Sequence, residues 1–148
     1  MNFLCSISFI VSTIFIVLLI YRIVTEIRDN YENEPEDPFV LSLIQEIRQI
    51  SPEVDDVVKR LKFFKGRKSY TINKKNVYLC KNDENGMLYG KNQLVLVLIH
   101  EISHALCSEI GHTPSFYKIM DNLLIKAEKH KLYDPAIQHV ENYCPGPE

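Results

Sequence analysis

The chain has 148 residues, of which 46% are hydrophobic, and its formal net charge is −2 at neutral pH. This length allows one domain with a core large enough to fold without staples. The slight acidic excess excludes the broad basic surface that binds a nucleic-acid backbone, so no nucleic-acid partner is expected. With no CxxC pair and few cysteines for its size, the chain should carry four free thiols, at Cys5, Cys80, Cys107 and Cys144.

The first predicted element is an uncharged, apolar run from Phe3 to Tyr21. As a helix it would be about 28 Å long, close to the hydrocarbon thickness of a bilayer. A cleaved signal peptide would carry basic residues before the run and small residues at a cleavage site, and neither is present. The sequence therefore predicts an uncleaved transmembrane anchor over residues 1–24, which contacts the lipid bilayer through residues 3–24.

The residues on either side of this run predict its orientation. Arg22 and Arg28 follow the run, whereas only Met1 and Asn2 precede it. An excess of Lys and Arg marks the cytoplasmic side of a membrane span. We therefore expect a single-pass protein of a host or virion membrane, with its C-terminal domain in the cytosol.

Residues 25–38 form a predicted linker between the anchor and a domain over residues 39–148. The stretch 29–38 is acidic, contains two prolines and lacks an apolar period. Because proline is tolerated in the first turn of a helix, Pro38 can begin the first helix of the domain.

Two helices are expected at the start of the domain. Apolar residues recur at spacings of three and four from Val40 to Ile50, which is the pattern of an amphipathic helix. Ser51 and the proline after it predict the N-cap and first residue of a second helix. This helix should run to about Leu61 and stop by Gly66.

A β-hairpin is expected next. The stretches 70–72 and 77–79 are β-branched, aromatic or aliphatic, and residues 73–76 between them favour a turn. Residues 82–86 should form a polar loop, since they lack the ligand spacing of an EF-hand. The basic run 59–68 is interpreted as a solvated helix end and loop, with contact to anionic lipid headgroups as the alternative.

From Asn92 the chain is apolar nearly all round, as in a helix buried on most sides. Within it stands the sequence His-Glu-Ile-Ser-His at residues 100–104. Two histidines four positions apart lie on one face of a helix, so His100 and His104 can bind one Zn²⁺. Glu101 can then act as general base on a water held by the metal.

A zinc peptidase site needs three protein ligands and one open position. We choose His112 as the third ligand, because it lies in the break between two predicted helices. A helix continued to Ile110 would end about 9 Å beyond His104. The helix should therefore loosen near Cys107, and residues 108–111 should form the return.

Other residues compete for roles in this site. Glu128, in a helix that Thr113 and the next proline should begin, is the alternative third ligand. Nothing in the sequence selects among the candidates for oxyanion stabilisation, which are Tyr133, Tyr143, His130 and His139.

The plain alternative to a metal site is a buried helix whose histidines form only hydrogen bonds. Glu101 weighs against it, because a carboxylate on an almost wholly apolar helix is costly to bury without a partner. A metal ion with its water gives this carboxylate a partner. The sequence therefore predicts one zinc ion.

The sequence HEISH followed by HTPSF resembles the HExxH…HxxxF pattern of the SprT/WLM group of small zinc peptidases. The resemblance covers about Tyr70 to Asp134 and implies a minimal gluzincin-like core, with His100, His104 and His112 as ligands and Glu101 as catalytic base. Similar single-domain proteins are encoded by large DNA viruses. Members of the group that act on DNA–protein crosslinks carry further segments that this chain lacks, so that role is not expected.

Together these features predict an α+β fold: a transmembrane helix followed by a small zincin-like domain with a β-hairpin and an HExxH helix. The expected function is a membrane-anchored zinc metallopeptidase that hydrolyses a protein or peptide substrate, which the hairpin's outer strand could align. The alternative is a non-catalytic, zinc-stabilised structural or interaction module of a membrane or virion.

Overall fold

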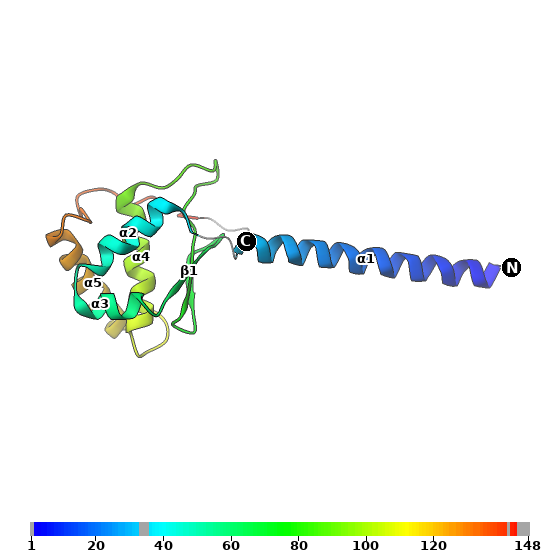
Figure 1. Ribbon diagram of the computed structural model, residues 1–148, viewed down its shortest axis with the longest axis horizontal. Helices are drawn as coiled ribbons and strands as arrows, with labels where there is room; N and C mark the ends of the chain where they lie inside the picture. Colours follow the sequence, from blue (N-terminus) through cyan, green and yellow to red (C-terminus); the bar gives the residue numbers. More distant parts are fainter. Residues whose placement is uncertain (1, 33–35, 142, 145–148) are drawn as a thin grey trace. The chain divides into compact units, whose positions relative to one another are not determined.

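The protein is a mixed α+β chain in a computed structural model that describes residues 2–32, 36–141 and 143–144. It divides into two compact units, Met1–Asn33 and Glu34–Glu148. The elements are, in chain order, α1 (Asn2–Glu32), α2 (Pro38–Arg48), α3 (Pro52–Val58), β1 (Lys62–Lys65), β2 (Tyr70–Ile72), β3 (Asn76–Leu79), α4 (Lys91–Leu106) and α5 (Pro114–Lys129) (Figure 1).

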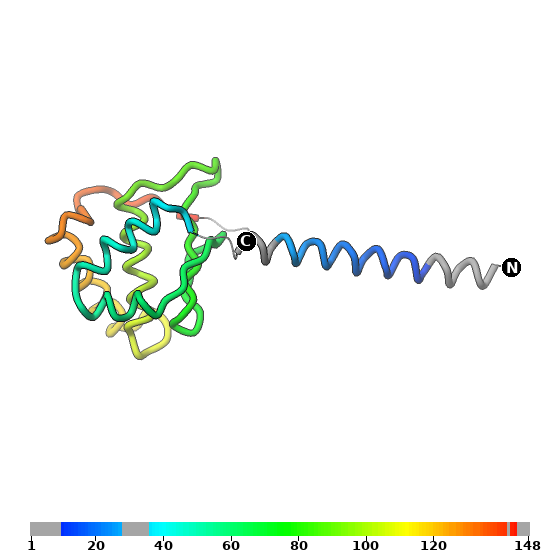
Figure 2. Tube along the Cα trace, viewed as in Figure 1, coloured from blue at the N-terminus to red at the C-terminus, as the bar shows by residue number. Residues whose placement is uncertain are grey.

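The first unit is the single helix α1. Its segment Ile10–Ile27 has a mean hydropathy of 2.1, and its side chains are not buried within the structure. It is therefore long and apolar enough to cross a membrane. Figure 2 shows this segment as an unbroken helical path. The helix continues to Glu32, into residues for which a linker was predicted.

Helices α2 and α3 open the second unit and begin where capping side chains predict. Asp37 accepts a hydrogen bond from the Phe39 amide at 2.9 Å, and Ser51 accepts one from the Val54 amide at 3.4 Å. These bonds satisfy amides that have no partner within the helix. The predicted end of this second helix, at about Leu61, was wrong. Helix α3 stops at Val58, and residues 62–65 form a strand.

The sheet has the strand order β1-β3-β2. β2 and β3 form the predicted antiparallel hairpin, with Thr71 opposite Val77. β1 pairs with β3 in parallel, and this pairing corrects the interpretation of residues 62–65 as a solvated helix end and loop. Gly66 ends this strand and not a helix: a Cβ atom there would lie 2.5 Å from the carbonyl oxygen of Lys68.

Helix α4 forms the centre of the second unit, in contact with α2, α3, α5 and β2 (Figure 1). Five of its apolar side chains are completely buried: Leu94, Val95, Leu98, Ile99 and Ile102. The prediction of a helix buried on most sides is thus confirmed. Close packing on several sides holds the backbone of α4 in one place, and with it the side chains at 100, 101 and 104.

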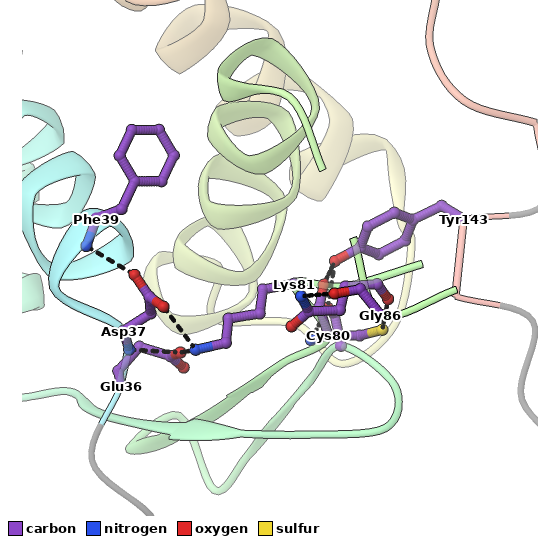
Figure 3. A network of polar contacts seen from close by, with 9 residues as sticks. Glu36, Asp37, Phe39, Cys80, Lys81, Gly86 and Tyr143 are labelled. Atoms are coloured by element: carbon purple, nitrogen blue, oxygen red, sulfur yellow. Dashed lines mark hydrogen bonds and ion pairs between the residues drawn. The ribbon is translucent and has the colours of Figure 1, made fainter. Parts of the chain in front are cut away.

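A buried ion pair joins the start of this unit to the end of the sheet (Figure 3). The Lys81 ammonium lies 3.1 Å from Glu36 Oε1 and 3.5 Å from Asp37 Oδ2. The Glu36 side chain is only 1% exposed, and its Oε2 atom has no hydrogen-bond partner among the described residues. Residues 36 and 37, predicted to be linker, are therefore part of the folded domain.

The expectation of four free thiols was wrong. Cys80, directly after β3, forms a disulfide with Cys144, and their Cα atoms are 6.3 Å apart. Cys107 is free and buried, and the side chain of Cys5 lies outside the described residues. Local spacing could not reveal a pair 64 residues apart. Disulfides form and persist mainly in oxidising compartments.

Candidate metal centre

Helix α4 and the loop after it bring three histidines together. His100 and His104 lie one turn apart on α4, which ends at Leu106 as the sequence led us to expect. Cys107 is extended, and Gly111 has φ = +84°, a left-handed conformation that favours glycine. The chain reverses there, and His112 returns over the helix.

The three imidazoles meet through the same ring nitrogen. The Nε2 atom of His104 lies 3.2 Å from those of His100 and His112, and the latter two are 3.1 Å apart. Histidine ligands about 2.05 Å from a tetrahedral zinc ion would have nitrogens about 3.3 Å apart. The triangle therefore fits three ligands of one tetrahedral ion.

Hydrogen bonds among the rings cannot explain this triangle. In a neutral imidazole, Nε2 either carries a proton and donates or carries a lone pair and accepts, but it cannot do both. Three Nε2 atoms that contact each other pairwise must then include two of the same kind. A cation shared by three lone pairs removes the conflict.

The surroundings favour the neutral imidazoles that a metal needs. Burial, together with the neighbouring His104 and His112, lowers the pKa of His100 to about 4. Burial also lowers the pKa of His104, with further contributions from His112 and Lys74.

Phe116 packs against all three imidazoles. Its ring centroid is 5.0 Å from that of His100, 4.3 Å from that of His104 and 4.9 Å from that of His112. Phe116 is completely buried, and its amide donates to the N-cap hydroxyl of Thr113 at 3.3 Å. The start of α5 thus supports the three rings, because their positions depend on one rigid side chain.

Glu101 lies beside the histidines and is only 3% exposed. Its Oε2 atom accepts a hydrogen bond from the hydroxyl of Thr71 in β2, at 2.7 Å. Burial raises the pKa of this carboxyl to about 7, and the hydrogen bond from Thr71 opposes the rise. A carboxyl of this kind can accept and release a proton near neutral pH.

The centre opens into a cavity of about 480 Å³. The three histidines and Glu101 line this cavity together with Thr71 and Lys74 of the hairpin. Ile110, 92% exposed, stands in the return loop at the rim. The cavity opens to both the three histidines and the Glu101 carboxyl.

The alternative ligand, Glu128, lies elsewhere. Its side chain is exposed and lines a separate cavity with Tyr133. Tyr133 bonds with His139, with 3.0 Å between Oη and Nε2, and His130 caps the end of α5. None of these candidates lines the cavity of the three histidines.

Tyr143 lies closer to the three histidines, but its hydroxyl already forms hydrogen bonds with other residues. It lines an adjacent cavity with His100 and Glu101. Its hydroxyl hydrogen-bonds with Ser69 and donates to the carbonyl of Cys80. Burial raises its pKa above the ordinary value.

Thr71 and Lys74 line the cavity of the three histidines but were not identified from the sequence as site residues. Lys74 belongs to the hairpin turn, and its ammonium donates to the carbonyl of Cys107 at the end of α4. Thr71 is the polar residue between Tyr70 and Ile72, so strand alternation could have placed it on the opposite face from both. The contacts of Thr71 and Lys74 with α4 depend on packing between distant segments.

The chain is similar to two viral proteins. It is 42% identical over 94 residues to the uncharacterized protein 136R of Invertebrate iridescent virus 6, an alignment that covers 62% of this chain and 53% of that protein. It is 41% identical over 90 residues to the uncharacterized protein 042R of Invertebrate iridescent virus 3, covering 60% and 57%. The chain thus spans just over half the length of these curated relatives. No family model and no solved structure matches it.

Proposed function

We propose that this protein is a membrane-anchored zinc peptidase with a zincin-like domain of the SprT/WLM kind. One observation carries the proposal: three Nε2 atoms lie 3.1 to 3.2 Å apart, and a buried carboxylate follows the first of these histidines on the same helix. His100, His104 and His112 would hold one Zn²⁺.

Each group would have a defined task in peptide hydrolysis. Zinc, when bound, would supply Lewis-acid chemistry for the scissile carbonyl and the attacking water. Glu101 takes a proton from that water and passes it to the leaving amine. Without a metal ion, burial raises the pKa of the Glu101 carboxyl to about 7.

The hairpin supports a protein or peptide as substrate. β2 lies at one edge of the described sheet, since β3 occupies the middle of the order β1-β3-β2. Residues of β2 also line the cavity of the metal centre. An extended peptide that pairs with this edge would pass the three histidines with its backbone held straight.

We further propose that α1 anchors the protein in a membrane, with the domain on the oxidising side. The apolar segment Ile10–Ile27 supports the anchor. The Cys80–Cys144 disulfide supports the side, and it outweighs the two arginines, Arg22 and Arg28, that favour the cytosol.

The deciding experiment compares the full-length wild type with Glu101→Gln, and with Glu128→Gln as the matched control, all in detergent at equal zinc occupancy. Cleavage of a proteome-derived peptide library is followed by mass spectrometry. Glu101→Gln should lower the single-turnover rate by at least about 100-fold, the contribution of a positioned general base, while zinc content stays the same. Glu128→Gln should cleave like the wild type.

Two results would contradict the proposal. Equal cleavage by wild type and Glu101→Gln would remove Glu101 from the role of base. No cleavage by any zinc-loaded protein would favour the non-catalytic, zinc-stabilised module.

A further inference from the structure

The hairpin contributes a residue that faces the buried carboxylate. Side chains alternate between the two faces of a strand, so Thr71 points away from the face of Tyr70 and Ile72. Tyr70 stacks on Tyr78 with ring centroids 4.8 Å apart. Thr71, half-buried and opposite the buried Val77, faces α4.

The distances show which atom of Glu101 the Thr71 hydroxyl binds. Thr71 Oγ1 lies 2.7 Å from Glu101 Oε2 and 3.3 Å from the main-chain oxygen of Glu101. A hydroxyl has one proton to donate. The shorter contact, to a charged acceptor, is the stronger bond when the carboxyl is ionised.

We propose that Thr71 is a positioning residue for the base of this peptidase. Its hydroxyl holds Oε2 of Glu101 and leaves Oε1 to face the cavity. In this role, which rests on the proposed function, it sets which oxygen receives the proton of the attacking water.

The proton balance of the reaction involves Glu101 alone. The O–H bond of the water breaks as Oε1–H forms, and the water oxygen bonds to the scissile carbon while the π pair of the C=O bond moves to the carbonyl oxygen. Oε1–H then breaks as N–H forms on the leaving amine, and the C=O double bond re-forms as the C–N bond breaks. Thr71 keeps its own proton throughout, so its effect comes from orientation.

The hairpin has a second attachment to α4 that does not involve Glu101. Lys74 donates to the carbonyl of Cys107, three residues beyond His104. Removing the hydroxyl of Thr71 should therefore leave the hairpin docked. Valine has nearly the shape of threonine and an equal preference for strands, which makes Thr71→Val a clean deletion of the hydroxyl.

The first test measures kinetics on the zinc-loaded, full-length protein in detergent, with the best-cleaved peptide of a proteome-derived library. Thr71→Val should lower kcat by about 10-fold or more, the value of a hydrogen bond to a charged group, with KM and zinc affinity within about 2-fold of wild type. Thr71→Ser, which restores the hydroxyl, should recover most of kcat. A wild-type kcat for Thr71→Val, or a Thr71→Ser protein as slow as Thr71→Val, would overturn the proposal.

The second test does not depend on activity. Urea unfolding of the metal-free protein at pH 8 is measured for Thr71→Val with Glu101 present and with Glu101→Met. Deleting the hydroxyl should lower the equilibrium constant for folding about 10-fold when Glu101 is present. In the Glu101→Met variant it should lower that constant less than about 2-fold. Equal shifts would show that the bond is absent in solution and overturn the role of Thr71 alone. A further outcome is that the shifts differ as expected while no zinc-loaded protein cleaves any peptide. That result would overturn both the role of Thr71 and the peptidase function.

Discussion

His112 Nε2 lies 3.1 Å from His100 Nε2, although the two residues are twelve positions apart and α4 ends between them. The contact depends on the early end of α4 at Leu106 and on the left-handed Gly111. A straight continuation of the helix would have carried His112 away from His100 and His104.

Replacing His112 by alanine should therefore lower zinc affinity by at least about 100-fold. Loss of residues that only orient metal ligands already costs 10- to 100-fold, and a direct ligand should cost more. Zinc content of the full-length protein, titrated against a chelator, measures the change. His130→Ala, at the exposed end of α5, is the control and should bind zinc like the wild type. Undiminished zinc in His112→Ala would mean that another group is the third ligand.

The contribution of Glu101 to the stability of the metal-free protein should fall as pH rises from 4.5 to 7. Over this range the unfolded chain releases the proton of Glu101 while the folded protein retains it, because burial raises the folded pKa from 4.5 to about 7. The loss should reach about 3 kcal/mol at most, at about 1.4 kcal/mol per pKa unit. Glu101→Gln removes this dependence.

Urea unfolding with a chelator, from pH 4.5 to 8, measures the difference between wild type and Glu101→Gln. His100, whose pKa burial lowers to about 4, contributes to both proteins and largely cancels in the difference. A difference that does not change with pH would show that the Glu101 carboxyl is not buried in solution.

Lys81→Met should lower the free energy of unfolding by about 3–5 kcal/mol, because it leaves the buried Glu36 carboxylate without its cation. The control is Lys91→Met, which breaks a 2.8 Å pair with Glu46 whose side chains are 44% and 41% exposed. An exposed pair of this kind contributes less than about 1 kcal/mol. Chemical unfolding compares the two variants. Equal losses in the free energy of unfolding would mean that the Glu36 carboxylate is exposed to solvent.

Alkylation of the native, full-length protein should leave Cys80 and Cys144 unmodified until a reductant is added, because they form the disulfide. The buried Cys107 thiol should react only after unfolding.

In sealed membranes, a tag at the C-terminus should be protected from a protease that is added on the cytosolic side of the membrane. Cleavage of the tag together with alkylation of Cys80 would restore the cytosolic placement that Arg22 and Arg28 indicate.

Local patterns were enough to predict much of the fold and the candidate histidines. Several predicted features depend on residues within a few positions of one another. They are the caps at Ser51 and Thr113, the hairpin around residues 73–76 and the buried helix α4. Helix period, capping and turn propensity act over that range. The spacing of His100 and His104 is a consequence of the same helical period.

Contacts between distant segments were decided only by the tertiary structure. They include the parallel pairing of β1 with β3, the Glu36–Lys81 ion pair, the Cys80–Cys144 disulfide and the Thr71–Glu101 hydrogen bond. Each joins residues whose neighbours in sequence carry no mark of the partner, and each forms because tertiary packing brings the segments together. The sequence by itself determined the helices, the hairpin and the histidine spacing, whereas packing decided what the carboxylate between the histidines contacts.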